Sequence, residues 1–165
     1  KWAASGVALL LLGTLIATPA AAQTTDDASI LAIAHVTTGY AALAVTSGDA
    51  LEFNDVVAGT PVAAASPGTF TVLGEAGAAV TLDFDLPTEL TRTLGGTIPI
   101  SFGAADGSWD DAATTGVFNP NGSAPATLGV AGQLTVGING TVAPPVGTVT
   151  GDYEGTITLT VTYVL

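Results

Sequence analysis

The clearest pattern in the chain is a strict alternation of polar and apolar residues near its C-terminal end. From position 156 the order is Thr-Ile-Thr-Leu-Thr-Val-Thr-Tyr-Val-Leu, which follows the turn-like stretch 151–155. A period of two over β-branched and apolar residues predicts a half-buried strand, with the threonines on its outer face. The inward face of this strand then carries Ile157, Leu159, Val161, Tyr163 and Leu165.

Shorter alternating segments predict further strands along the chain. They cover 42–46, 51–56, 69–73, 78–85, 97–102 and 133–138, and Gly, Pro or Asn residues separate them. Pro99 cannot donate to a ladder, so its strand is expected at an edge or a bulge. Residues 104–126 are rich in turn formers and predict a long surface loop. The pattern as a whole predicts an all-β fold, an immunoglobulin-like antiparallel β-sandwich of about seven to eight strands.

The first 22 residues have the features of a secretory signal. Lys1 precedes an apolar run at 7–16, and small residues at 20–22 provide a cleavage site. The run is shorter than the roughly 20 residues that span a bilayer, so we expect cleavage and no membrane contact afterwards. A retained anchor helix of the type IV pilin kind is the alternative. The predicted organisation is therefore a signal at 1–22, an extension at 23–37 and a sandwich domain at 38–165.

The extension contains an apolar strand candidate at 28–36, after the acidic leader 23–27. Apolar residues occupy both parities of this candidate, which suits a strand covered on both sides or inserted between two sheets. One parity carries Ile30, Ala32, Ala34 and Val36; the other carries Leu31, Ile33 and His35.

Composition and charge exclude several function classes. The 165 residues contain 14 acidic residues, two basic residues and no cysteine, for a net charge of −12. The missing basic face argues against nucleic acid as a partner, and the missing cysteines exclude disulfides and thiol chemistry. The low content of Lys, Arg, Glu and Gln also disfavours exposed helices.

Several blocks resemble a bacterial secreted family catalogued as domain of unknown function 4402. The matching segments are Leu51-Glu52-Phe53-Asn54, Phe70 to Glu75, Val80 to Pro87, Gly132 to Gly137, and Gly151 to Tyr163. Glu52 and Asn54 depart from the Asp and Gly usual in the first block. The resemblance covers about 28–163 and implies an exported bacterial protein of the cell surface or periplasm.

The C-terminal block is also similar to subunits of chaperone–usher pili and to spore-coat U proteins. In those proteins an incomplete sandwich accepts the N-terminal strand of a neighbour. The similarity implies self-association into a head-to-tail homopolymer, with periplasmic chaperone and usher machinery as possible further partners. Tyr163 stands third from the end rather than next to last, which weakens the case for a dedicated chaperone.

Candidate chemistry is sparse, and we expect no enzyme and no cofactor. His35 is the only histidine and lies in the apolar stretch, without a nucleophile motif nearby. Asp83, Asp85 and Glu89 are carboxylates for a glycosidase, but the first two share the polar face of one strand. Asp106, Asp110 and Asp111 form a weak calcium candidate whose spacing does not match an EF-hand.

The sequence therefore favours a structural subunit of an extracellular filament or surface layer that polymerises by strand exchange. The predicted interface combines residues 30–34, Val36, Ile157, Leu159, Val161 and Tyr163. The alternative is a monomeric binding module that holds a glycan or a protein through the loop 104–126, with Trp109 as its anchor.

Overall fold

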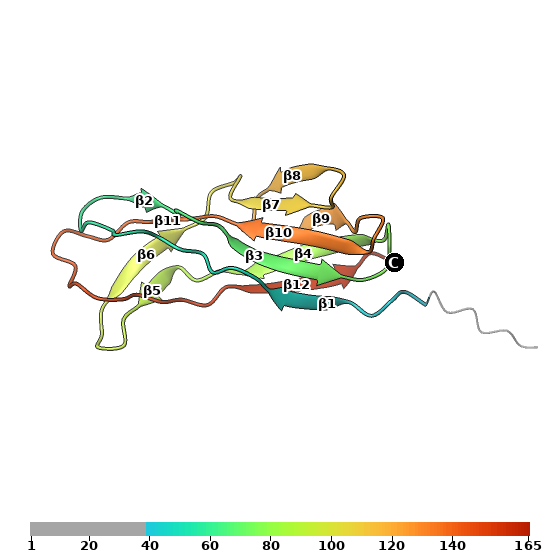
Figure 1. Ribbon diagram of the computed structural model, residues 1–165. Helices are drawn as coiled ribbons and strands as arrows, with labels where there is room; N and C mark the ends of the chain where they lie inside the picture. Colours follow the sequence, from blue (N-terminus) through green and yellow to red (C-terminus); the bar gives the residue numbers. More distant parts are fainter. Residues whose placement is uncertain (1–38) are drawn as a thin grey trace, which may run out of the picture. The chain divides into compact units, whose positions relative to one another are not determined.

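A computed structural model describes residues 39–165 of the chain, and this part contains twelve strands and no helix (Figure 1). The all-β prediction is confirmed. The predicted signal at 1–22 and the whole predicted extension at 23–37 lie outside the described residues. The strands are β1 (Ala44–Ser47), β2 (Val62–Ala63), β3 (Gly68–Leu73), β4 (Ala79–Asp85), β5 (Glu89–Thr91), β6 (Thr97–Ser101), β7 (Gly107–Asp110), β8 (Thr115–Phe118), β9 (Ala124–Thr127), β10 (Gln133–Ile138), β11 (Thr141–Val142) and β12 (Thr158–Tyr163).

These strands form three antiparallel sheets. The first has the order β1-β3-β10-β7-β8, the second β2-β11-β6-β5, and the third β12-β4-β9. Strands far apart in sequence pair at the centre, as where Leu134 of β10 lies opposite Val72 of β3. The predicted strand 156–165 is β12, which pairs with β4 from Thr158 opposite Asp85 to Tyr163 opposite Val80.

The first core lies between the first and the third sheet and makes this part of the molecule a sandwich. Its buried residues come from alternate positions of the facing strands, as their sequence pattern predicts. Val72, Leu82, Leu134 and Val136 are fully shielded from solvent. Phe70, Phe84 and Phe118 pack at its margin, with ring centroids 5.9 and 6.1 Å apart in successive pairs.

The second core has a sheet on one side only. Leu90 of β5, Ile98 and Ile100 of β6 and Val142 of β11 form its buried part. Residues that belong to no strand lie against them, among them Leu51, Phe53 and Tyr153, and all three are half-buried. The described residues thus supply no second sheet to cover this apolar layer.

Four expectations need correction. The number of strands exceeds the predicted seven to eight. The predicted loop 104–126 contains β7, β8 and most of β9. Strands β7 and β8 can pair because Gly107 and Gly116 make room for large side chains on the neighbouring strand. Within residues 39–165, the predicted strand 51–56 makes only one bridge, between Glu52 and Ser66. Pro99 lies in an interior strand, where it still accepts a hydrogen bond from the amide of Ala143 at 3.0 Å.

Candidate functional site

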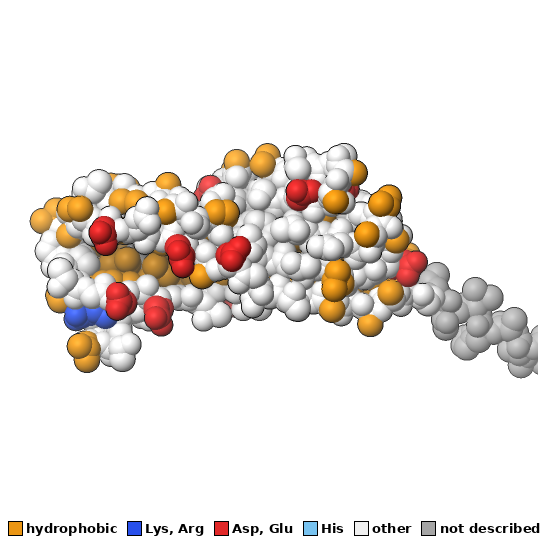
Figure 2. All heavy atoms as spheres, viewed as in Figure 1, with side chains coloured by type: hydrophobic (Ala, Val, Ile, Leu, Met, Phe, Trp, Pro, Cys, Tyr) orange, Lys and Arg blue, Asp and Glu red, His pale blue; other side chains and the backbone are white. Residues whose placement is uncertain are grey.

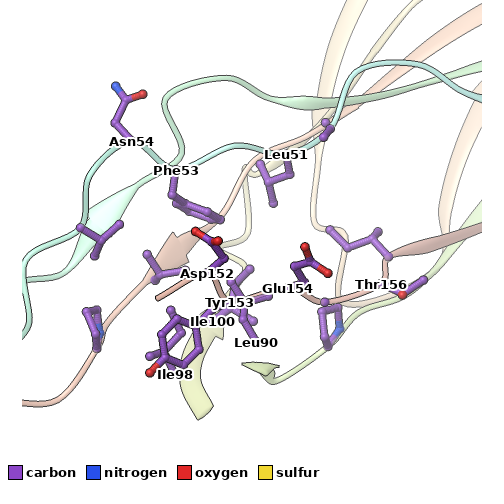
Figure 3. Close-up of a pocket in the computed structure, with 18 of the residues that line it drawn as sticks. Leu51, Phe53, Asn54, Leu90, Ile98, Ile100, Asp152, Tyr153, Glu154 and Thr156 are labelled. Atoms are coloured by element: carbon purple, nitrogen blue, oxygen red, sulfur yellow. The ribbon is translucent and has the colours of Figure 1, made fainter. Parts of the chain in front are cut away.

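An open groove of about 1470 Å³ crosses the second core. Its floor is made by Leu90, Ile98, Ile100 and Val142, and its two walls are the segments 47–58 and 148–157. Figure 2 shows apolar side chains at the bottom of this hollow with carboxylates along its edges. In Figure 3 Leu51 and Phe53 point into the groove from the first wall, whereas Asn54 points away from it.

The first wall continues the direction of β1 and is tied to the start of β3. Gly48 and Asp49 donate to the carbonyl and the hydroxyl of Thr69, both at 2.8 Å. Further along, the amide of Glu52 donates to Ser66 at 3.1 Å and its carbonyl accepts from Ala65 at 2.8 Å. Main-chain groups alternate in direction along extended backbone, so those of Phe53 turn away from Ser66 and toward the groove. Among the described residues, no backbone hydrogen bond involves Leu51.

The second wall leads into β12 and is tied to β5. Thr91 and Glu154 exchange two main-chain hydrogen bonds of 2.8 and 2.9 Å. The Arg92 guanidinium donates to the carbonyl oxygen of Thr150 at 3.0 Å and fixes the far part of the wall. The same alternation turns the main-chain groups of Tyr153 and Gly155 away from β5 and toward the groove.

The two walls therefore present free main-chain groups to each other across an apolar floor. No backbone hydrogen bond joins segment 47–58 to segment 148–157 within the described residues. Each wall has the hydrogen-bonding capacity of a sheet edge, so one extended strand laid between them could pair on both sides. Its inward side chains would meet the floor.

The rim of the groove is acidic. Asp49, Asp55, Asp152 and Glu154 line it, and Arg92 is the one cation in the part of the chain that the structure describes. An apolar strand without acidic residues fits this rim better than an acidic one, since like charges repel at close range.

The predicted interface residues divide into three groups. Ile30, Leu31, Ala32, Ile33, Ala34 and Val36 lie outside the described residues, as does His35. Ile157 lines the groove. Leu159, Val161 and Tyr163 belong to the first core rather than to the groove floor.

Within the described part of the chain, β12 nevertheless lies at the edge of its sheet. Val164 donates to Ala79 at 3.0 Å, so the even-numbered residues of this strand pair with β4. The main-chain groups of Leu159, Val161 and Tyr163 then face the side on which β12 has no partner strand among residues 39–165.

Most of the carboxylates considered for catalysis or metal binding accept hydrogen bonds from nearby groups of the domain. Asp83 accepts from the hydroxyl of Ser123, and Glu89 is exposed on β5. Asp106 accepts from the amide of Gly103 at 2.6 Å, and Asp110 from that of Ala112 at 2.7 Å. Across residues 39–165 no group of three acidic or histidine side chains is arranged to hold a metal ion, so the calcium hypothesis gains no support.

Trp109 is not the exposed loop residue that the binding-module alternative requires. It lies on β7 opposite Gly116, is half-buried and packs against the first core. Asp111, which follows β7, accepts from the amides of Ala113 and Thr114 at 2.8 and 2.6 Å. These two backbone hydrogen bonds, that of Thr114 first, lower the pKa of its carboxyl.

Sequence reasoning missed most of the groove. Leu90, Ile98, Ile100 and Val142 come from three short strands, and nothing local distinguishes them from ordinary core residues. The sequence offered only the alternating pattern of segment 51–56 and the Gly-flanked pattern of segment 151–157 as signals of the two walls.

No family model and no curated protein matches this chain. Among solved structures, it is similar to a chain from work described as "Chaperone-tip adhesin complex is vital for synergistic activation of CFA/I fimbriae biogenesis". The TM-score is 0.47 at 11% identity, over 74% of this chain and 42% of that one. This chain thus spans less than half the length of that protein. In its described part it contains no helix that could span a bilayer.

Proposed function

We propose that this protein is an exported structural subunit that polymerises by donor-strand exchange into a filament or surface layer. The observation that carries the proposal is the open groove over the second core, an apolar floor between two walls with unpaired main-chain groups. In the proposal, the apolar segment 28–36 of another copy fills this groove. Main-chain hydrogen bonds to both walls would supply affinity, and alternate side chains would supply fit.

The parity of the inserted strand follows from the polarity of its residues. If His35 faced the floor, its imidazole would lie among Leu90, Ile98 and Ile100 without a polar partner from those side chains. Burying an unsatisfied polar group costs about 1–3 kcal/mol. We therefore assign the inward face to Ile30, Ala32, Ala34 and Val36, and the outward face to Leu31, Ile33 and His35.

The direct test removes the donor. A variant lacking residues 23–37 should stay monomeric under conditions where the full chain forms polymers that sediment and are visible by negative-stain microscopy. Normal polymers from the truncated protein would contradict the proposal.

A peptide with the sequence of residues 28–36 should bind the truncated protein and raise its melting temperature in proportion to the logarithm of peptide concentration. A peptide with Ala32→Asp and Ala34→Asp should lose this effect, because both carboxylates would meet the apolar floor. The matched control carries Leu31→Asp and Ile33→Asp, which place the same charges outward, and it should keep most of the binding. Equal loss with both peptides would contradict the assigned parity.

A further inference from the structure

The chain that enters the described domain is fastened to the end of β12 by a closed set of contacts. The Tyr163 hydroxyl donates to the carbonyl oxygen of Ala41 and accepts from the amide of Glu75, both at 2.7 Å. The Glu75 carboxylate accepts from the amide of Ala41 at 3.2 Å. The ring of Tyr40 stacks on that of Tyr163 with centroids 4.6 Å apart. We call these four residues the tyrosine latch.

The latch is built into the packing at this end of the domain. Gly74 leaves space for it, since a Cβ there would overlap the Tyr163 hydroxyl and lie 2.9 Å from side-chain atoms of Leu43 and Leu128. In Figure 1 the start of β1 and the end of β12 lie at the same end of residues 39–165, with β2 and β11 at the other. The point where residues before 40 leave the domain is thereby fixed.

This exit point limits which residues could fold back into the groove of their own chain. The tightest reversal that leaves Tyr40 in place pairs residue 37 with residue 40, so that paired residue numbers add up to 77. Leu51 would then lie opposite Asp26, and Phe53 opposite Thr24. These polar residues, one of them acidic, do not suit an apolar floor with an acidic rim.

The chain's own N-terminal segment is too short to enter the groove in the opposite direction, parallel to the wall 47–58. Along the chain, the path from Tyr40 in the latch to Leu51 in the first wall is about 36 Å at 3.3 Å per residue. An inserted strand parallel to the wall 47–58 would have to end at the far end of the groove and return to Tyr40 through residues 37–39, which span at most roughly 14 Å.

Release of the latch changes which residues can pair with the wall 47–58. A reversal at residues 42 and 43 leaves β1 intact and pairs residue 41 with residue 44. Phe53 then lies opposite Ala32, and Leu51 opposite Ala34, so the apolar segment 28–36 reaches its own groove.

We propose that the tyrosine latch keeps segment 28–36 out of its own groove and so directs it to the groove of a second copy. The inference rests on the function proposed above. It assigns Tyr163, Tyr40 and Glu75 a role in choosing the partner, separate from the groove that binds it. The Tyr163 hydroxyl makes two of the hydrogen bonds of the latch. Removing this hydroxyl should therefore open the latch, even though residue 163 keeps its aromatic ring.

The test uses the absence of native cysteines. One full-length chain carries Ile33→Cys on the outward face of the donor, another carries Thr156→Cys on the groove wall, and a third carries both. A short bis-maleimide then reports insertion. A mixture of the two single variants can be joined only between chains, whereas the double variant at high dilution reports joining within one chain. Each is prepared with Tyr163, with Tyr163→Phe and with the control Thr114→Val, which removes a hydroxyl bonded to Asp111 and outside the latch.

With Tyr163 and with the control, we expect links between chains and few within one. Tyr163→Phe should shift the ratio of inter-chain to intra-chain links toward intra-chain links by about tenfold, as expected for two lost hydrogen bonds. An unchanged ratio in folded Tyr163→Phe would overturn the latch and leave strand exchange intact. Predominant intra-chain links with Tyr163 present would also overturn it. If Tyr163→Phe does not fold, the ratio of inter-chain to intra-chain links is measured in Tyr40→Ala and Glu75→Ala instead. The same shift is then expected, and an unchanged ratio would again overturn the latch. No link of either kind, together with no polymers, would count against the proposed function itself.

Discussion

Asp111 closes the turn that follows β7 and determines how this turn responds to pH. Its carboxylate accepts from two amides and from the Thr114 hydroxyl, around Ala112, which has a φ of 72°. The lowered pKa of Asp111 means that the charged form is favoured in the folded chain. Its contribution is therefore complete above the ordinary value of 3.8 and is lost as pH falls through the lowered pKa.

The amide proton signals of Ala113 and Thr114 should report this titration by NMR, with a midpoint below 3.8. Asp111→Asn should abolish the titration at both amides, because the amide side chain keeps an acceptor but cannot be protonated in this range. A midpoint at or above 3.8 would contradict the assigned cause.

Gly116 is small because of the residue that lies opposite. A Cβ at this position would come within 2.5 to 2.7 Å of the indole atoms of Trp109. Gly116→Ala should lower the free energy of unfolding by about 1–3 kcal/mol, since Trp109 is packed against the first core and cannot move freely. Gly122→Ala is the matched control, with no atom within 4 Å of the added Cβ, and should change stability by less than about 0.5 kcal/mol. Urea denaturation measures both, and equal effects would argue against the Trp109 contact.

At the scale of elements, β12 pairs along one edge only among the strands of residues 39–165. Its even-numbered residues pair with β4, so the amides of Thr160 and Thr162 should exchange slowly with solvent deuterium. The amides of Leu159 and Val161 face the open side and should exchange at least about tenfold faster in the monomer. Hydrogen exchange followed by NMR on the chain lacking 23–37 measures this difference. Uniform protection along β12 would show that its outer edge already has a partner.

Elements with strict local alternation were predicted well. Segments 69–73, 78–85, 97–102 and 133–138 correspond to β3, β4, β6 and β10 within about two residues. Their burial depends only on the parity of their own residues, which a sequence displays.

Elements whose stability comes from a partner were not predicted. Gly107 of β7 lies opposite Phe118 of β8, and Gly116 of β8 lies opposite Trp109 of β7. Neither segment has the pattern of a strand by itself, because each needs the other as its partner. The groove depends on distant pairing in the same way. Segment 51–56 has the side-chain alternation of a strand, yet only Glu52 has a bridge partner among residues 39–165, and this missing ladder cannot be seen in the sequence.

At the scale of the whole molecule, charge opposes assembly. Each chain has 14 acidic and two basic residues, and Asp26 and Asp27 come directly before the segment that we place in the groove. In an assembled pair these two carboxylates approach a rim that includes Asp49, Asp55 and Asp152. Salt should relieve the repulsion, because the screening length falls from about 30 Å at 0.01 M to about 10 Å at 0.1 M.

The rate of polymerisation, followed by light scattering, should therefore rise about tenfold or more between these salt concentrations. The variant with Asp55→Asn and Asp152→Asn should polymerise faster at low salt and show a shallower salt dependence. Asp110→Asn removes one charge on β7, away from the groove lining, and should leave the slope nearly unchanged. Comparison of the three slopes separates repulsion at the rim from the effect of net charge. If equal slopes were found in all three proteins, the copies would be meeting at a surface other than the groove.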